Sequence, residues 1–224
     1  MEPDERFGET PLASAVRSGN AAVAALLLDA GANAARAPCV AAAITRDYGS
    51  AALLRLLAER GAPLRGDELH RLSECAAFMD NGRWSAADVE AMVAALVTRG
   101  ARVNRIGAVQ QLSDHIVSRG LPAIACSALH VCAARRYEED VVMLSSAPSA
   151  HLALVRALLA GGADANVRDA GGETPLARLA EVQAAHAASA HRSPLHEQHG
   201  AWRALGARCA GVAALLEAAG GVRV

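Results

Sequence analysis

The strongest constraint on this chain is an apolar segment that recurs five times and stops at glycine each time. Every copy carries leucine, valine or alanine at spacings of three and four residues, which places them on one face of a helix. Glycine then ends the helix because it adopts the left-handed conformation without strain. The closing glycines are Gly31, Gly61, Gly100, Gly162 and Gly220. Because one short helix cannot bury its apolar face alone, the copies are expected to stack around a shared core.

A second motif opens the first and the last copy. The same residues, Gly-Glu-Thr-Pro-Leu-Ala, occur at 8–13 and at 172–177. The threonine hydroxyl can cap a helix, and proline at the first helical position loses no hydrogen bond. From Thr10 to Gly31 is 21 residues and from Gly162 to Thr174 is 12, which together give a period of 33.

In these motifs the sequence resembles the ankyrin-repeat family. Residues 169–174 follow the family's Asp-x-x-Gly-x-Thr opening, and Ser127-Ala128-Leu129-His130 resembles its Thr-Pro-Leu-His. The resemblance covers nearly the whole chain and implies an all-α solenoid, in which stacked helix-turn-helix units are joined by short β-turn or hairpin connections. One domain is expected over 1–224. Its approximate repeats are 5–36, 37–66, 67–104, 122–167 and 168–224.

The spacing of the closing glycines locates expected insertions. The glycines are 30, 39, 62 and 58 residues apart, so the C-terminal half exceeds the period by 29 and 25 residues. We place the extra residues between helices, where repeat insertions are tolerated. The expected insertions lie near 105–125, 137–149 and 183–204.

Composition supports helices and excludes several classes of protein. Alanine and leucine dominate a chain that is 53% hydrophobic but only 3% aromatic, which favours helices over a β-sandwich. The formal net charge of −1 argues against bulk-charge binding of nucleic acid. No apolar run approaches the roughly 20 residues of a membrane span, and no secretory signal is evident. The five cysteines are expected to be reduced thiols, so we expect an intracellular protein, cytoplasmic or nuclear.

The second helices are expected to supply the larger core residues. In the first copy these are Val23, Leu26 and Leu27, and each later copy has a comparable set. The last helix, from Arg208 to Ala219, is expected to keep Arg208 and Glu217 in water.

Eight histidines raise the question of a metal site. His186, His191, His196 and His199 cluster late in the chain with Glu197, but their spacing matches no compact zinc pattern, and a solvated loop is the competing interpretation. Cys126 and Cys132 flank His130. The resemblance instead implies a structural role for that histidine, hydrogen bonding between units. Asn104 and Asn166 occupy the family's turn asparagine and are expected to bond turn backbone. No metal site or cofactor is predicted.

The resemblance implies a non-enzymatic module that binds a protein partner of unknown identity on its concave face, as a monomer. No nucleophile elbow or phosphate-binding loop is present, and the chain contains no lysine. Exposed aromatic and arginine side chains are typical interface anchors, although Phe7 also fits a covering position at the N-terminal end of the core. The candidate partner-binding residues are Arg6, Phe7, Glu9, Arg17, Ser18, Asp47, Tyr48, Arg168, Ala170 and Glu173.

Two alternatives remain open. In the first alternative, the chain is an adaptor or regulatory subunit that presents a client to another machine, such as a ubiquitin ligase. The absence of lysine suits this role, because the adaptor then has no lysine side chain that the ligase could modify. The codon bias of a GC-rich genome explains that absence more simply. The second alternative is metal binding by the histidine-rich segment.

Overall fold

A computed structural model describes residues 10–35, 39–44, 50–79, 84–107, 125–134, 149–190 and 199–223. These ranges contain ten helices. They are α1 (Pro11–Arg17), α2 (Ala21–Asp29), α3 (Cys39–Ala43), α4 (Ala51–Glu59), α5 (Glu68–Met79), α6 (Ala86–Thr98), α7 (Ala128–Ala134), α8 (Ser149–Ala160), α9 (Pro175–Ala190) and α10 (His199–Ala218).

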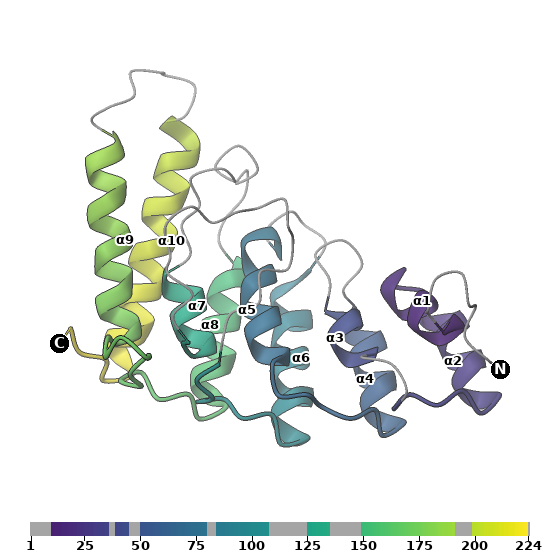
Figure 1. Ribbon diagram of the computed structural model, residues 1–224. Coiled ribbons are helices and arrows are strands. Elements are labelled where there is room, and N and C mark those ends of the chain that lie inside the picture. Colours follow the sequence, from purple (N-terminus) through teal and green to yellow (C-terminus); the bar gives the residue numbers. More distant parts are fainter. Residues whose placement is uncertain are drawn as a thin grey trace.

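The helices stack as five pairs in chain order, and we call each pair with its closing turn a unit. The first helices α1, α3, α5, α7 and α9 form one row, in which each contacts the next. The second helices α2, α4, α6, α8 and α10 form a parallel row in the same way. Figure 1 shows the two rows running from the N-terminal unit to the C-terminal unit, with the closing turns along one edge. The expected all-α solenoid is therefore confirmed.

Local chemistry explains where the helices begin and end. The Thr10 hydroxyl accepts a hydrogen bond from the Ala13 N–H, and the Thr174 hydroxyl accepts one from the Ala177 N–H. Ser85 and Asp88 form a reciprocal capping box at the start of α6. The five closing glycines all have φ between +74° and +92°, the left-handed conformation expected of them.

One continuous apolar core runs through both rows. Leucine and valine from the second helices supply most of its large side chains, and alanine fills the closer approaches between helices. Arg208 belongs to this buried region, with only 2% of its surface exposed. The prediction that Arg208 faces water was wrong, because α10 turns that side chain inward.

The last helix pair is longer than its sequence indicated. We expected an insertion over 183–204, but α9 continues to Ala190 and α10 already begins at His199. Figure 1 shows these two helices extending beyond the other pairs. Alanine-rich sequence sustains helix here despite its scattered polar residues. The other two expected insertions fall mostly outside the described residues.

The second helix of the first unit, α2, also differs from expectation. Val23 and Leu26 were predicted to be core residues, yet they are 42% and 68% exposed. Leu27 is half-buried, and only Ala24 of α2 is fully buried. The helix lies at the end of its row, where no described element covers its outer face.

The connections between units include isolated β-type pairing. Gly107 and Cys126 exchange two backbone hydrogen bonds of 3.1 and 3.0 Å, and Asp169 N–H bonds to Glu173 O at 3.0 Å. Within the described ranges there is no extended strand. No helix in those ranges is long and apolar enough to cross a membrane.

Candidate partner-binding surface

Half of the predicted partner-binding residues lie outside the described part of the chain. These residues are Arg6, Phe7, Glu9, Asp47 and Tyr48. The other five divide between two distant places, the end of α1 and the turn before α9. Because α1 and α9 open the first and the fifth unit, the structure does not bring these two groups together.

Arg17 and Ser18 lie at the C-terminal end of α1, and both are exposed. The Ser18 hydroxyl donates to Ala15 O at 3.1 Å and so helps to end the helix. Arginine at this position also interacts favourably with the negative end of the helix dipole. These two residues are open to a partner but have local structural roles.

Arg168, Ala170 and Glu173 lie on the turn that leads into α9. The Arg168 guanidinium donates to Gly172 O at 2.6 Å, which holds the side chain across its own turn. Ala170 is exposed and Glu173 is half-buried. This turn therefore presents an ordered arginine to solvent.

A buried carboxylate organises the same turn. Asp169 accepts hydrogen bonds from Gly171 N–H and Glu173 N–H at 2.8 and 3.0 Å. Its other oxygen accepts from Arg178 Nε at 2.8 Å. Burial raises the pKa of Asp169, but these hydrogen bonds and the Arg178 charge outweigh it, so the pKa lies below its usual value. The Asp169 hydrogen bond, in turn, raises the pKa of Arg178.

The middle of the first-helix row offers little open surface. Every side chain from Ser127 to Ala133 is buried, and so are seven of the eight described side chains on α5. Buried polar groups there include Glu68, His70 and Glu74. A partner that lies along the row of first helices would therefore contact exposed polar side chains mainly on α1 and α9.

The closing turns, in contrast, carry arginines at successive units. We call this set the arginine row, and it consists of Arg65, Arg102, Arg105, Arg168 and Arg223. Two exposed aliphatic residues, Ile106 and Val222, lie beside it. All five arginines are exposed. The row follows the edge of the array where Figure 1 shows the turns.

Nearby carboxylates are mostly engaged within the structure. Asp67 pairs with Arg71 at 2.7 Å. Both oxygens of buried Glu68 accept backbone N–H groups, from Arg65 and Gly66. Glu217 lies 3.4 Å from Arg223. Around Arg102 and Arg105, residues 99–107 contain no acidic side chain.

Two histidines connect neighbouring units by the same hydrogen bond. His130 Nδ1 accepts from the Ser127 N–H at 3.3 Å, so Nε2 carries the proton and donates to Glu173 O at 2.8 Å. His70 Nε2 lies 2.7 Å from Cys126 O, the corresponding carbonyl one residue before the next helix cap. The structural role predicted for His130 is confirmed. His70 was missed, although its Leu-His pair repeats Leu129-His130.

Two asparagines connect the closing turns. Asn104 donates to Gly162 O at 3.0 Å and accepts from Asp164 N–H at 2.7 Å. Asn166 donates to Gly220 O at 2.9 Å and accepts from Val222 N–H at 2.8 Å. The predicted bonding of turn backbone is confirmed, and the backbone belongs to the next unit.

The geometry of His130 does not suit metal binding with Cys126 and Cys132, because both of its ring nitrogens are already hydrogen bonded. Among the described residues, no group of three or more His, Cys, Asp or Glu could hold a metal ion. Of the late histidines, His191 and His196 lie outside the described residues. For His186 on α9 and His199 on α10 only the backbone is described.

Comparison with known proteins agrees with this architecture. Residues 7–39 match the family described as Ankyrin repeat. That match covers the first unit, and the later helix pairs stack in the same arrangement as the first. Ankyrin repeats generally mediate protein–protein interaction, and they are typically non-enzymatic.

A similar solved structure is the crystal structure of the ankyrin repeat domain of Bcl-3, described as a unique member of the IkappaB protein family. It is 20% identical, and the similarity covers 79% of this chain and 99% of that one, with a TM-score of 0.21. No curated protein matches the sequence.

Proposed function

We propose that the protein binds a protein partner along the arginine row and its two aliphatic neighbours, Ile106 and Val222. The observation that carries this proposal is the repetition of exposed arginine on the closing turns of units 2 to 5. Arginine is enriched among residues that contribute most to interface affinity, and aliphatic neighbours supply the apolar area. Arg17 and Ser18 are exposed at the C-terminal end of α1 and are not part of this surface.

The charge of this surface defines the partner segment that fits it. The chain as a whole has a formal charge of −1, so five arginines on one edge represent local segregation of positive charge. An extended partner segment with acidic and apolar side chains complements the row. The described side chains of α5 and α7 are mostly buried, which supports the closing turns, and not the row of first helices, as the principal binding surface.

The test is affinity capture from the source cells with three forms of the chain. A double variant, Arg102→Glu with Ile106→Ser, reverses charge and removes apolar area on one turn. Both side chains are exposed, so the fold should remain intact. Arg55→Glu is the matched control, because Arg55 is an exposed arginine on the helical part of α4, away from the turns.

A protein that binds the wild type and the Arg55→Glu control, but not the double variant, supports the proposal. The association should also weaken with increasing salt, because rim charges are screened. Equal capture by all three forms would remove the turns as the binding surface.

We further propose that the protein is a monomer inside the cell, in the cytoplasm or the nucleus. The five free cysteines support this location because thiols persist in reducing compartments. Fluorescence microscopy of the tagged protein and sedimentation velocity of the pure protein test the two statements. A secreted protein or a stable dimer would contradict them.

A further inference from the structure

The outer face of α2 carries the same apolar pattern that is buried in every other second helix. The residue eight positions before the closing glycine is Val23 in α2. Its equivalents are buried in all four later units, as Leu53, Met92, Leu154 and Val212. Leu27, four positions before Gly31, is half-buried, whereas its equivalents Leu57, Leu96, Leu158 and Leu216 are buried.

The last unit identifies which neighbour buries these positions. The second helix α10 contacts α8, and it has no later second helix beside it, yet Val212 and Leu216 are fully buried. Both α2 and α10 also contact the first helix of their own unit, so the preceding second helix is the neighbour that α10 has and α2 lacks. In the first unit no described second helix precedes α2, and Leu26, on the same side, is 68% exposed.

The two ends of the array are chemically different. At the position three residues before the closing glycine, the earlier units have Leu28, Ala58, Val97 and Leu159. The last unit has Glu217 there, exposed and paired with Arg223. A charge at this position opposes the addition of a further unit after α10. In the described α2, the outer-face positions Val23, Leu26 and Leu27 are all apolar.

The turn after α2 also presents unused hydrogen-bonding groups. Asn104 and Asn166 each bridge the carbonyl of a closing glycine and the N–H two residues later in the next unit. The equivalent groups in the first unit are Gly31 O and Asn33 N–H. Neither group hydrogen bonds to another described residue.

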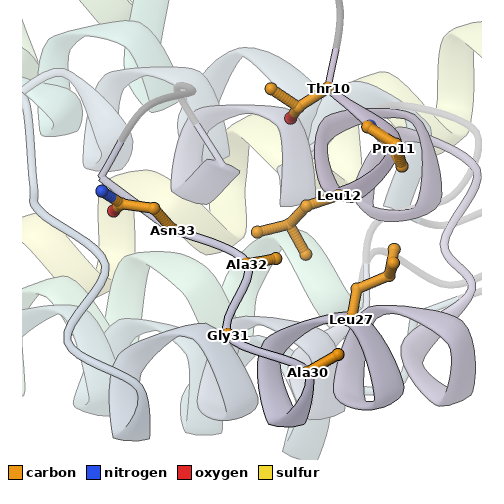
Figure 2. Close-up of a pocket in the computed structure, with 8 residues that line it drawn as sticks. All are labelled: Thr10, Pro11, Leu12, Leu27, Ala30, Gly31, Ala32 and Asn33. Carbon is orange, nitrogen blue, oxygen red and sulfur yellow. The ribbon is translucent and has the colours of Figure 1, made fainter. Parts of the chain in front are cut away.

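Both groups border a cavity at this end of the array. Its volume is about 340 Å³, and it lies between the start of α1 and the turn after α2. Figure 2 shows Leu12 and Leu27 in its wall beside Gly31 and Asn33. The face therefore combines apolar side chains and one acceptor–donor pair in the arrangement that receives a preceding unit elsewhere in this chain.

We propose that the N-terminal end of the array docks an ankyrin-type unit of another protein. The described interfaces of this chain define the partner's chemistry. Its second helix carries alanine, valine or leucine seven and three residues before a closing glycine, as Val155 and Leu159 do in α8. Asparagine follows that glycine by four residues, as Asn166 follows Gly162, and bridges Gly31 O and Asn33 N–H. This site is separate from the arginine row.

The test uses the full chain and a stable designed ankyrin array as the probe. The last unit of the probe copies residues 149–167 as its second helix and closing turn, because this segment is the natural neighbour of α10. Isothermal titration calorimetry should detect a 1:1 complex. Leu26→Asp should weaken it at least about 30-fold, because an unpaired charge would be buried.

Two controls assign the contact. Ala210→Asp adds the same charge on an exposed position of α10 and should leave the affinity unchanged. Changing the probe's copy of Asn166 to alanine should weaken binding about fivefold, since two hydrogen bonds are lost. Circular dichroism verifies the fold of Leu26→Asp, which is expected to be intact because Leu26 is largely exposed.

Several outcomes would overturn the proposal. One is no complex with the wild type, and another is a complex that Leu26→Asp does not weaken. If sedimentation velocity of the chain alone shows a dimer that Leu26→Asp dissociates, the face belongs to a second copy. If the complex forms only after residues 1–9 are removed, the chain's own N-terminal segment occupies the face. The double variant Arg102→Glu with Ile106→Ser should bind the probe as tightly as the wild type does. A negative result for docking at the N-terminal end therefore leaves the proposed binding along the arginine row untouched.

Discussion

His130 donates a 2.8 Å hydrogen bond from Nε2 to the carbonyl of Glu173, across the interface between the fourth and the fifth unit. The histidine is 1% exposed and its other ring nitrogen accepts from Ser127. This bond fixes the opening turn of the last unit against α7. Polar groups of this kind give the C-terminal interfaces a specificity that apolar packing alone does not supply.

Replacing His130 by alanine should destabilise the protein by about 2–4 kcal/mol. The substitution removes the bond to Glu173 O, leaves that carbonyl without its partner and opens a cavity. Urea unfolding followed by circular dichroism measures the change. Arg156→Ala, an exposed substitution on α8, serves as the control and should alter the free energy of unfolding by less than about 0.5 kcal/mol. A change that small at His130 would show that the bond contributes little.

The pH dependence of stability should show that His130 is kept neutral. Burial lowers its pKa below the ordinary value of 6.5, and the Arg178 and His70 charges act in the same direction. The Glu173 carbonyl and the Asp169 carboxylate oppose this effect. Below pH 6.5 the unfolded chain therefore binds the proton more readily than the folded chain does.

The free energy of unfolding contributed by His130 should be fully present above pH 6.5. It should decrease as the pH falls toward the lower folded pKa. The difference between wild type and His130→Gln, measured by urea unfolding from pH 7.5 to pH 5, isolates this contribution. If the stability difference between wild type and His130→Gln instead increased as the pH fell, the predicted direction of the pH dependence would be wrong.

Asp169→Asn should cost about 3 kcal/mol of stability. The variant removes the buried Asp169 charge from the largely buried Arg178 guanidinium, which then keeps only the exposed Glu181 as a charged partner. Glu181→Gln is the matched control, since Glu181 is the exposed second partner of the same arginine. Its effect should be within about 0.5 kcal/mol. If thermal unfolding showed that Asp169→Asn and Glu181→Gln destabilise the protein equally, the Asp169–Arg178 ion pair would contribute no more than the exposed one.

Cys126 should react slowly with alkylating reagents in the folded protein. Burial raises its pKa to about 11, with further contributions from the carboxylates of Asp169 and Glu74. At pH 8 the thiolate should be roughly 100-fold scarcer than for a free thiol with a pKa near 9. Peptide mass spectrometry after timed iodoacetamide treatment, with and without denaturant, measures the ratio. Equal rates would mean that this thiol is not shielded.

Sequence reasoning succeeded where local chemistry decides the structure. Glycine at Gly31 and Gly220 ends a helix because of its backbone freedom, and Thr10 begins one through its hydroxyl; neither property depends on distant neighbours. The period of these signals was enough to predict stacked units. The family resemblance of the segment from Ser127 to His130 identified the structural role of His130.

Predictions failed where burial depends on neighbours. Val23 has the pattern of a core residue but lies at the end of a row, whereas Arg208 has the chemistry of a surface residue but faces inward. Alanine-rich helix over 183–190 replaced an expected loop, since polar residues there did not outweigh helix propensity. Of the candidate site, Arg17 and Arg168 were found as exposed arginines. The arginine row was missed, because only the stacking places its members on one edge.

The side-chain bonds that connect neighbouring units differ from one end of the array to the other. Histidine and asparagine side chains bridge the C-terminal interfaces, whereas the interface between the first two units has an exposed Arg60–Asp29 ion pair of 2.7 Å. No such bridge joins the first two units among the described residues. The N-terminal unit should therefore open more readily than the rest of the array.

Native-state hydrogen exchange with mass spectrometry tests this claim most directly, by comparing α2 with α10. Both helices lie at an end of the second-helix row, but only the closing turn after α10 is bridged by Asn166. The amides within α2 should exchange faster than those in residues 208–218, by at least about tenfold, which corresponds to roughly 1.4 kcal/mol. Equal protection of the two helices, or faster exchange in α10, would contradict the account.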